Sequence, residues 1–253
     1  MKGTVYLVGA GPGAPDLLTM RAVRLLERAD VVFHDALVHP DSLALARRAR
    51  KVPVGKRCGG HSTAQRFVEK RLVDAAAEFD VVVRLKGGDP MLFGRAQEEI
   101  DALARAGVRC EVVPGVSAAF AAAADVGVSL TERGVSRSVV LATPRVGRGE
   151  CSSRWAASVL RADTAALYMA AGALAETAAE LRAAGASAST PVVAVARASL
   201  PDRRILATTL GGLERLGLSE RDGPLVVLLG EVYRGRVAAP RSGPARAAEP
   251  SGR

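Results

Sequence analysis

Three glycine-rich turns are the features of this sequence best suited to bring the backbone close to a ligand. Each follows a short run of β-branched residues, and the turns occupy residues 9–14, 85–90 and 113–117. The first turn satisfies the pattern G-x-G-x-x-G/A of dinucleotide-binding proteins, and Asp35 lies about twenty residues further on. Pro12 and Pro15, however, remove backbone N–H groups that a pyrophosphate would need as donors.

The three turns together favour a nucleoside over a dinucleotide. Glycine loops at the carboxyl ends of neighbouring parallel strands line one crevice, and glycine lets the backbone approach a ligand closely. Backbone carbonyls and the carboxylate of Asp89 are then available as acceptors, which suits the sulfonium of S-adenosylmethionine. We therefore expect binding of S-adenosylmethionine and no appreciable binding of NAD or NADP. The alternative is three tight turns without a ligand, the more frequent role of a single isolated glycine-rich turn.

The elements that must position these turns alternate between strand and helix. This alternation predicts a parallel sheet covered by helices on both faces. We expect strands at residues 4–8, 31–33, 51–54, 81–85 and 109–113, and helices at 17–28, 40–48, 62–79 and 91–106. The last-but-one helix opens on a capping box that begins at Ser62.

The pattern changes after Pro114-Gly115, which predicts a second domain. Helices are expected there at 117–124 and 172–184, and strands at 138–142, 165–169, 191–196, 204–208 and 224–230. We expect two α/β domains, residues 1–115 with a parallel sheet and residues 116–234. Residues 235–253 combine Pro, Gly, Ala and Arg without hydrophobic periodicity, which predicts a disordered tail.

The composition is that of a packed protein from a reducing compartment. Hydrophobic residues make up 49% of the 253 residues and aromatic residues 4%, which argues against disorder and against an aromatic-rich recognition surface. Cys58, Cys110 and Cys151 form no C-x-x-C pair, so we expect neither a disulfide framework nor a metal site. With no apolar run of membrane-spanning length and no secretory signal, we expect a cytoplasmic protein without a membrane partner.

The charge is basic, and a formal net charge of +9 raises nucleic acid as a partner. Most of the cations are arginines in an alanine-rich chain, which we interpret as GC-rich coding bias. Several of them fall at the end of the chain, at Arg234, Arg236, Arg241, Arg246 and Arg253. The remaining excess suits any anionic partner, small molecules included, and we expect no nucleic-acid partner.

Several segments, in order, resemble the tetrapyrrole methylase family. The resemblance covers residues 3–233, and its most specific part is the combination of Val-Gly-Lys-Arg with Arg-Leu-Lys-Gly-Gly-Asp-Pro. The segments that carry it are residues 5–13, 29–35, 54–57, 84–90, 93–95 and 113–117. Within the family, the chain is most similar to members that methylate uroporphyrinogen III.

The resemblance implies a homodimeric enzyme of two α/β domains, with a mixed sheet in the second domain and a ligand cleft between the two. Such an enzyme transfers methyl groups from S-adenosylmethionine to C2 and C7 of uroporphyrinogen III. The products would be S-adenosylhomocysteine and precorrin-2, on the routes to sirohaem and cobalamin, and the partner would be an anionic tetrapyrrole. By motif, the donor contacts fall on Pro12, Gly87, Gly88, Asp89, Leu92, Ser117, Ala118, Met169 and Ala198.

Asp35 and Lys56 match the proton acceptor and the proton donor proposed for this family. From the residues alone, Asp35 could equally be a helix cap or a turn residue, and Lys56 could be a solvated loop lysine. Asp89 could cap the helix that follows, and Met169 could belong to the core.

The sequence departs from the family pattern at several positions. Ala14 replaces a common Asp, and His34 replaces the Tyr that usually precedes the aspartate. In the second domain, residues 143–145 replace a Thr-Gly-His pattern, and residues 196–197 replace an acid–amide pair. These departures leave the second-domain side of the site less defined than the first.

Three other functions stay open. The first is methylation at another site on the corrin pathway, and the second is ribose methylation of ribosomal RNA by the same fold. The basic charge favours RNA, but no aromatic residues cluster among the cations. The third is a non-catalytic regulator that binds a nucleoside, which would need neither Asp35 nor Lys56.

Overall fold

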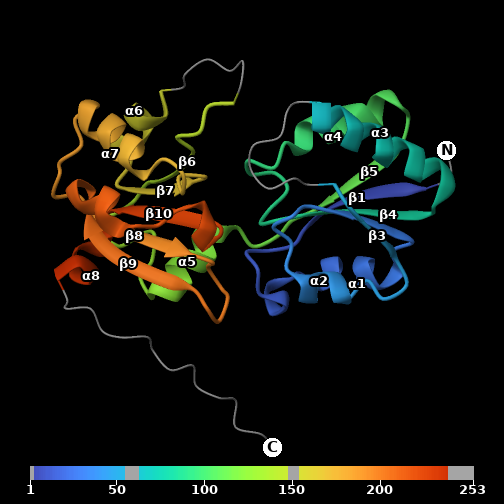
Figure 1. The fold of residues 1–253 in the computed structure, drawn as a ribbon, viewed down its shortest axis with the longest axis horizontal. Helices are drawn as coiled ribbons and strands as arrows, with labels where there is room; N and C mark the ends of the chain where they lie inside the picture. The colour runs from blue at the N-terminus through green and yellow to red at the C-terminus, as the bar shows by residue number, and fades with distance from the viewer. Residues whose placement is uncertain (1–2, 55–62, 148–153, 239–253) are drawn as a thin grey trace, which may run out of the picture. The chain divides into compact units, whose positions relative to one another are not determined.

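The computed structural model describes residues 3–54, 63–147 and 154–238, and these residues form two compact units (Figure 1). The first unit contains the chain up to Gly127 together with the segment Ala196–Arg204, and the second contains Val128–Val195 and the residues from Ile205 on. Residue 115, the boundary predicted from the sequence, lies within the first unit.

The first unit is built on a five-stranded sheet in the order β3-β2-β4-β1-β5. All of its pairs are parallel, so the carboxyl ends of the strands lie at one edge. The strands are β1 (Thr4–Gly9), β2 (Val31–His34), β3 (Arg50–Pro53), β4 (Val81–Lys86) and β5 (Arg109–Val113). β1 lies between β4 and β5, and the turns after these three strands are the three glycine-rich turns.

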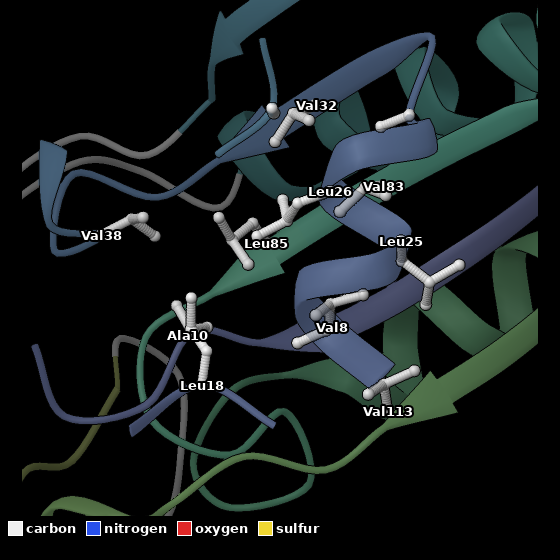
Figure 2. Packing of buried hydrophobic residues seen from close by; sticks show 13 residues of the cluster. Val8, Ala10, Leu18, Leu25, Leu26, Val32, Val38, Val83, Leu85 and Val113 are labelled. Carbon is white, nitrogen blue, oxygen red and sulfur yellow. The ribbon is translucent and has the colours of Figure 1, made fainter. Parts of the chain in front are cut away.

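Helices cover both faces of this sheet, as the strand–helix alternation predicts (Figure 1). On one face, buried residues of α1 (Met20–Arg28) pack on Val83 and Leu85 of β4 (Figure 2). Leu26 of α1 and Leu85 are both fully buried. Burial of one such leucine contributes about 1.5–3 kcal/mol. The short helix α2 (Pro40–Ala44) lies on the same face.

The opposite face of the sheet packs against α3 (Thr63–Glu78) and α4 (Ala96–Arg105). Its apolar cluster includes Val82 of β4, Leu72 of α3 and Leu103 of α4. Side chains alternate between the two faces of a strand, so Arg84 and Lys86 of β4 share this face with Val82. Helix α5 (Ala118–Val126) follows β5 and ends at Gly127, whose φ of 68° is left-handed.

The second unit contains a mixed sheet in the order β6-β7-β10-β8-β9. β6 and β7 pair in parallel, and β7 and β10 pair antiparallel. Strands β8 and β10 are buried along their whole length. The strands are β6 (Val139–Ala142), β7 (Thr164–Tyr168), β8 (Pro191–Ala196), β9 (Arg204–Thr209) and β10 (Leu225–Gly230). The parallel first sheet and mixed second sheet confirm the predicted fold class.

The helices of the second unit are mostly short. They are α6 (Trp155–Leu160), α7 (Leu174–Ala183), η2 (Leu210–Leu216), η3 (Glu220–Asp222), η4 (Glu231–Tyr233) and α8 (Arg234–Ala238). In the part of the chain that the structure describes, no helix combines the length and apolar character needed to cross a membrane.

Several sequence-based boundaries differ from the structure. Helix α2, expected to run to residue 48, ends at Ala44. Residues 91–95 form a turn before α4. Phe93 and Arg95 adopt left-handed φ angles of 53° and 54°, which are incompatible with a right-handed helix, so α4 begins only at Ala96. A short 3₁₀ helix, η1 (Pro15–Leu17), replaces the first residues expected in α1. The tail expected to be disordered from residue 235 begins as helix α8, where Arg234 follows η4 directly. The capping box at Ser62 lies outside the described residues.

Candidate functional site

The three glycine-rich turns of the first unit meet at the carboxyl edge of its sheet. Gly11 and Gly88 exchange two backbone hydrogen bonds, of 3.2 and 2.7 Å. A Cβ atom on Gly9 would lie 2.6 Å from the Cα of Gly115 and 2.8 Å from the carbonyl oxygen of Gly88. Only glycine therefore allows this approach, and the structure confirms that the turns form one cluster.

Several backbone N–H groups of this glycine cluster are already occupied within the protein. The N–H of Ala10 donates to the carbonyl of Lys86 at 2.7 Å, and that of Gly115 donates to Asp89 Oδ2 at 2.9 Å. The N–H of Ala14 donates to Ser199 Oγ at 3.0 Å. A pyrophosphate needs such groups free at the loop, so the cluster favours a ligand without phosphates, as the two prolines predict.

Gly88 leaves open space beside its backbone. Its φ is 68°, and a Cβ built there would have no atom within 4 Å among the described residues. The neighbouring Asp89 is half-buried, and its two carboxylate oxygens accept from the N–H groups of Gly115 and of Met91 (2.8 Å). Asp89 therefore joins two of the turns and does not cap α4, which begins only at Ala96.

Asp35 follows β2 directly and contacts a buried cation. Arg84 Nη2 lies 2.5 Å from Asp35 Oδ1, and the Asp35 side chain is 28% exposed. The other guanidinium nitrogens of Arg84 are also bound, Nη1 by the carbonyl of Leu85 and Nε by Glu99 Oε1 at 3.1 Å. Burial lowers the pKa of Arg84, but the charges of Asp35 and Glu99 and their hydrogen bonds raise it further, so Arg84 stays cationic.

Glu99 holds a second cation in the same cluster. Its Oε1 also accepts from Lys86 Nζ at 3.0 Å and from Gln65 at 3.4 Å. Burial and the nearby charge of Arg84 lower the pKa of Lys86 by more than Glu99 and Asp35 raise it. We call Asp35, Arg84, Lys86 and Glu99 the buried charge cluster, and its formal charges balance.

The segment Ala196–Arg204 reaches the first glycine turn within the first unit. Ser199 Oγ accepts from Ala14, and the N–H of Ser199 donates to Asp125 Oδ2 at 2.6 Å. Asp125 also pairs with Arg203 at 3.2 Å, so it holds this segment at two positions, Ser199 and Arg203. Ala198, a predicted donor contact, is 5% exposed beside Ser199.

Some predicted donor contacts have a left-handed non-glycine backbone or are next in sequence to such residues. Arg197 and Ser199, with φ of 56° and 71°, flank Ala198, and Met169, with φ of 59°, follows β7. Such conformations cost about 1–3 kcal/mol each and persist where the surrounding structure enforces them, often at ligand sites. Met169 is 43% exposed, so it is not a core residue.

The structure brings most of the predicted first-unit donor contacts together at one edge. Pro12, Gly87 and Leu92 are half-buried in or beside the glycine turns, and Leu92 N–H donates to the carbonyl of Asp89 at 3.3 Å. Ser117, which is buried, and Ala118 begin α5 after the third turn. Lys56, the predicted proton donor, lies outside the described residues.

Sequence reasoning missed Arg84, Lys86 and Glu99 as a unit, although two signals were present. Arg84 and Lys86 stand two residues apart in a run of valine and leucine, so they share one face of a buried strand. Glu99 lies on the buried stripe of α4 between Ala96 and Leu103. Two cations and one acid at core positions indicate a buried ionic cluster.

Fold and site define the class of protein: a two-unit α/β protein whose first unit gathers glycine turns and an ion-paired aspartate at one sheet edge. Among the described residues, no group of three or more His, Cys, Asp or Glu side chains could hold a metal ion. The chain belongs to the tetrapyrrole (corrin/porphyrin) methylase family, whose profile matches residues 4–214.

Within this family, the chain is similar to curated relatives and solved structures that have more specific names. A uroporphyrinogen-III C-methyltransferase of Pseudomonas aeruginosa is 43% identical, over 96% of this chain and 99% of its own. A siroheme synthase of Hahella chejuensis is 44% identical over 91% of this chain, which spans 50% of that longer protein. A crystal structure of uroporphyrin-III C-methyltransferase from Thermus thermophilus, complexed with S-adenyl homocysteine, has a TM-score of 0.81 at 39% identity and covers 92% of this chain and 100% of its own.

Proposed function

We propose that the protein is an S-adenosylmethionine-dependent methyltransferase that acts on uroporphyrinogen III and yields precorrin-2. The observation that carries this proposal is the glycine cluster, whose bound N–H groups and open side at Gly88 suit a nucleoside without phosphates. The relatives and the structural likeness support the choice of methyl donor and of acceptor class.

The donor is assigned to the turns of the first unit and to two positions beyond them. Pro12, residues 87–89, Leu92 and residues 117–118 would hold it on the first unit, with Ala198 and Met169 as further contacts. Their backbone carbonyls are the groups that a sulfonium favours. When bound, the donor supplies a methyl group attached to a positively charged sulfur, which is a good leaving group.

The reaction asks for positioning first and for a base afterwards. A pyrrole carbon of the porphyrinogen is electron-rich, so alignment with the S–CH₃ bond can supply most of the acceleration. The new C–C bond forms as the S–CH₃ bond breaks, and the electron pair stays on sulfur. The macrocycle then loses a proton, and we assign Asp35 as the base that accepts it, because Asp35 is partly exposed at the end of β2 and is held there by Arg84. Lys56 is proposed as the proton donor.

The acceptor is a polyanion, and the enzyme is proposed to be a cytoplasmic homodimer. Uroporphyrinogen carries eight carboxylates, and arginine side chains bind carboxylates with two parallel hydrogen bonds. The basic composition of the chain agrees with such a substrate. We expect neither nucleic acid nor membrane as a partner.

A single assay tests the proposed function. The purified protein is incubated under reducing conditions with uroporphyrinogen III and S-adenosylmethionine, and methyl groups are counted by mass spectrometry. Two added methyl groups are expected. A cobalt-precorrin-4 methyltransferase also resembles this chain, with a TM-score of 0.78 at 31% identity. Methylation of a later corrin intermediate but not of uroporphyrinogen III would therefore reassign the acceptor, and NAD binding as tight as donor binding would refute the donor assignment.

A further inference from the structure

Glu99 binds both cations of the buried charge cluster, yet it is not among the residues that are assigned to the donor. Its side chain is 0% exposed, and its Oε1 accepts from Arg84, Lys86 and Gln65. Its Oε2 is buried and has no hydrogen-bond partner among the described residues. A carboxylate in this position cannot reach solvent, so its charge acts only on the groups around it.

Arg84 connects Glu99 to Asp35, because its guanidinium donates hydrogen bonds to both carboxylates. All three guanidinium nitrogens of Arg84 are bound, to Glu99, to the carbonyl of Leu85 and to Asp35. A planar guanidinium held at three points has one orientation, and that orientation places Nη2 on Asp35. The Arg84 side chain is only 5% exposed, and its nitrogens already donate to groups within the protein. It therefore does not bind a substrate carboxylate.

We propose that Glu99 is a positioning residue for methyl transfer: through Arg84, it fixes the place of the Asp35 carboxylate. This inference rests on the proposed function, in which Asp35 accepts a proton. Without the charge of Glu99, two buried cations, Arg84 and Lys86, would share Asp35 as their one remaining counter-ion in the cluster. Uncompensated buried charge is costly, so the cluster would rearrange around Asp35.

The experiment is a double-mutant cycle between Glu99 and Asp35. Glu99→Gln keeps the volume and one acceptor oxygen, and the new amide nitrogen can take the place of Oε2, which has no described partner. The change therefore removes chiefly a charge. Four proteins are compared: the parent, Glu99→Gln, Asp35→Asn and the double variant. For each, kcat is measured as S-adenosylhomocysteine released, and donor-site affinity is measured by calorimetric titration with S-adenosylhomocysteine.

We expect Glu99→Gln to lower kcat roughly 10- to 100-fold, as for other residues that orient a reacting group from behind. In the Asp35→Asn background, the same change should alter kcat less than about twofold, because interacting residues are not additive. The Kd for S-adenosylhomocysteine should stay within about twofold throughout. Glu78→Gln, at an exposed position on α3, is the matched control and should leave kcat unchanged in both backgrounds.

An equal loss in both backgrounds would overturn the inference, since a merely structural role costs the same whether or not Asp35 is present. No loss in either background would overturn it as well. A parent protein that transfers no methyl group to uroporphyrinogen III would instead refute the proposed function. If Glu99→Gln alone does not fold, the same cycle is run with Lys86→Met in all four proteins. In the Glu99→Gln protein, Asp35 and Arg84 are then the remaining charges of the cluster, and they balance.

Discussion

Asp35 combines partial exposure with a cationic partner that is itself held in place. Arg84 donates to Asp35 Oδ1, and 28% exposure leaves one side of the Asp35 side chain open to a ligand. The resemblance to the family implied only Lys56 as a partner of Asp35 in the reaction, as the proton donor. The structure supplies Arg84, which comes from the neighbouring strand β4 and belongs to the Arg-Leu-Lys-Gly-Gly-Asp-Pro motif.

Asp35→Asn should therefore reduce turnover roughly 10²- to 10⁴-fold, the usual contribution of a positioned acid or base. The amide cannot take up the proton that the macrocycle releases. Affinity for S-adenosylhomocysteine should change little, as measured by calorimetry beside initial rates. Asp101→Asn is the control, since Asp101 is exposed on α4 and bonds Gln97. If donor affinity fell in step with turnover, Asp35 would be a donor ligand or a structural residue instead.

Single residues also mark the limit of the sequence analysis. The location of Asp35 and Asp89 at the carboxyl edge of the sheet could be predicted, because each follows a strand and belongs to a recognisable motif. The contact of Ser199 with Ala14 could not, because it joins residues 185 positions apart. The left-handed backbone of Arg197 and Ser199 was equally hidden, since sequence preference assigns such angles to glycine.

At the scale of elements, the glycine turns act as one packed cluster. A Cβ on Gly115 would collide with the carbonyl oxygen of Gly88, and that oxygen already accepts from the N–H of Gly11. Neither side of this contact is a flexible side chain, so the backbone of the turns must move to accept any larger residue. The shape of the glycine cluster, to which we assign the donor, therefore depends on how closely these backbones approach.

Gly115→Ala should lower the free energy of unfolding by about 1–3 kcal/mol, the usual cost of an overpacked site. It should also weaken S-adenosylhomocysteine binding, because the displaced turn carries Asp89 with it. Thermal unfolding and calorimetric titration measure the two effects. In Gly235→Ala, the new methyl group meets no atom within 4 Å, so stability and binding should hold. Parent-like affinity in Gly115→Ala would show that the donor does not use this cluster.

The strands were predictable because valine-rich segments bounded by turn residues leave little choice of structure. The ends of the helices were less predictable than the strands. Helix α4 was expected from residue 91, because residues 91–95 include good helix formers, but Asp89 binds the N–H of Met91 and two left-handed residues delay the start to Ala96. Helix α6 was missed because it follows a polar stretch that reads as a loop.

At the scale of the molecule, the half-buried thiol of Cys110 in the first unit and the buried hydroxyl of Tyr233 in the second make the stability of the protein depend on pH in the alkaline range. Burial raises the pKa of the Cys110 thiol to about 11 and that of Tyr233 to about 12. Folding thus favours their protonated forms. This contribution is complete below their ordinary pKa values and is lost as the pH rises through the folded values.

We expect the free energy of unfolding to fall between about pH 9 and pH 12, partly through these two groups. Urea unfolding, followed by circular dichroism across this range, measures the slope. The double variant Cys110→Ala/Tyr233→Phe should lose stability less steeply, since neither group then titrates. Parallel curves for the parent and the variant would show that the two groups titrate alike in the folded and unfolded chains.

The two-unit architecture was largely predictable, and the path of the chain between the units was not. Alternating strands and helices predict a parallel sheet, and the change of pattern after residue 115 predicts a second unit. That Ala196–Arg204 belongs with the first unit depends on Asp125, Ser199 and Arg203, three residues without a local signal.

The return of Ala196–Arg204 to the first unit has a consequence for synthesis on the ribosome. Strand β1 emerges first, but its neighbours β4 and β5 end only at Lys86 and Val113, so the centre of the sheet cannot pair until both have left the exit tunnel. Even then, the hydrogen bonds of Ala14 and Asp125 with Ser199 cannot form until more than half of the second unit has been translated. The nascent chain must therefore carry an unfinished first unit through the synthesis of the second, which is the period in which exposed strand edges invite misassembly.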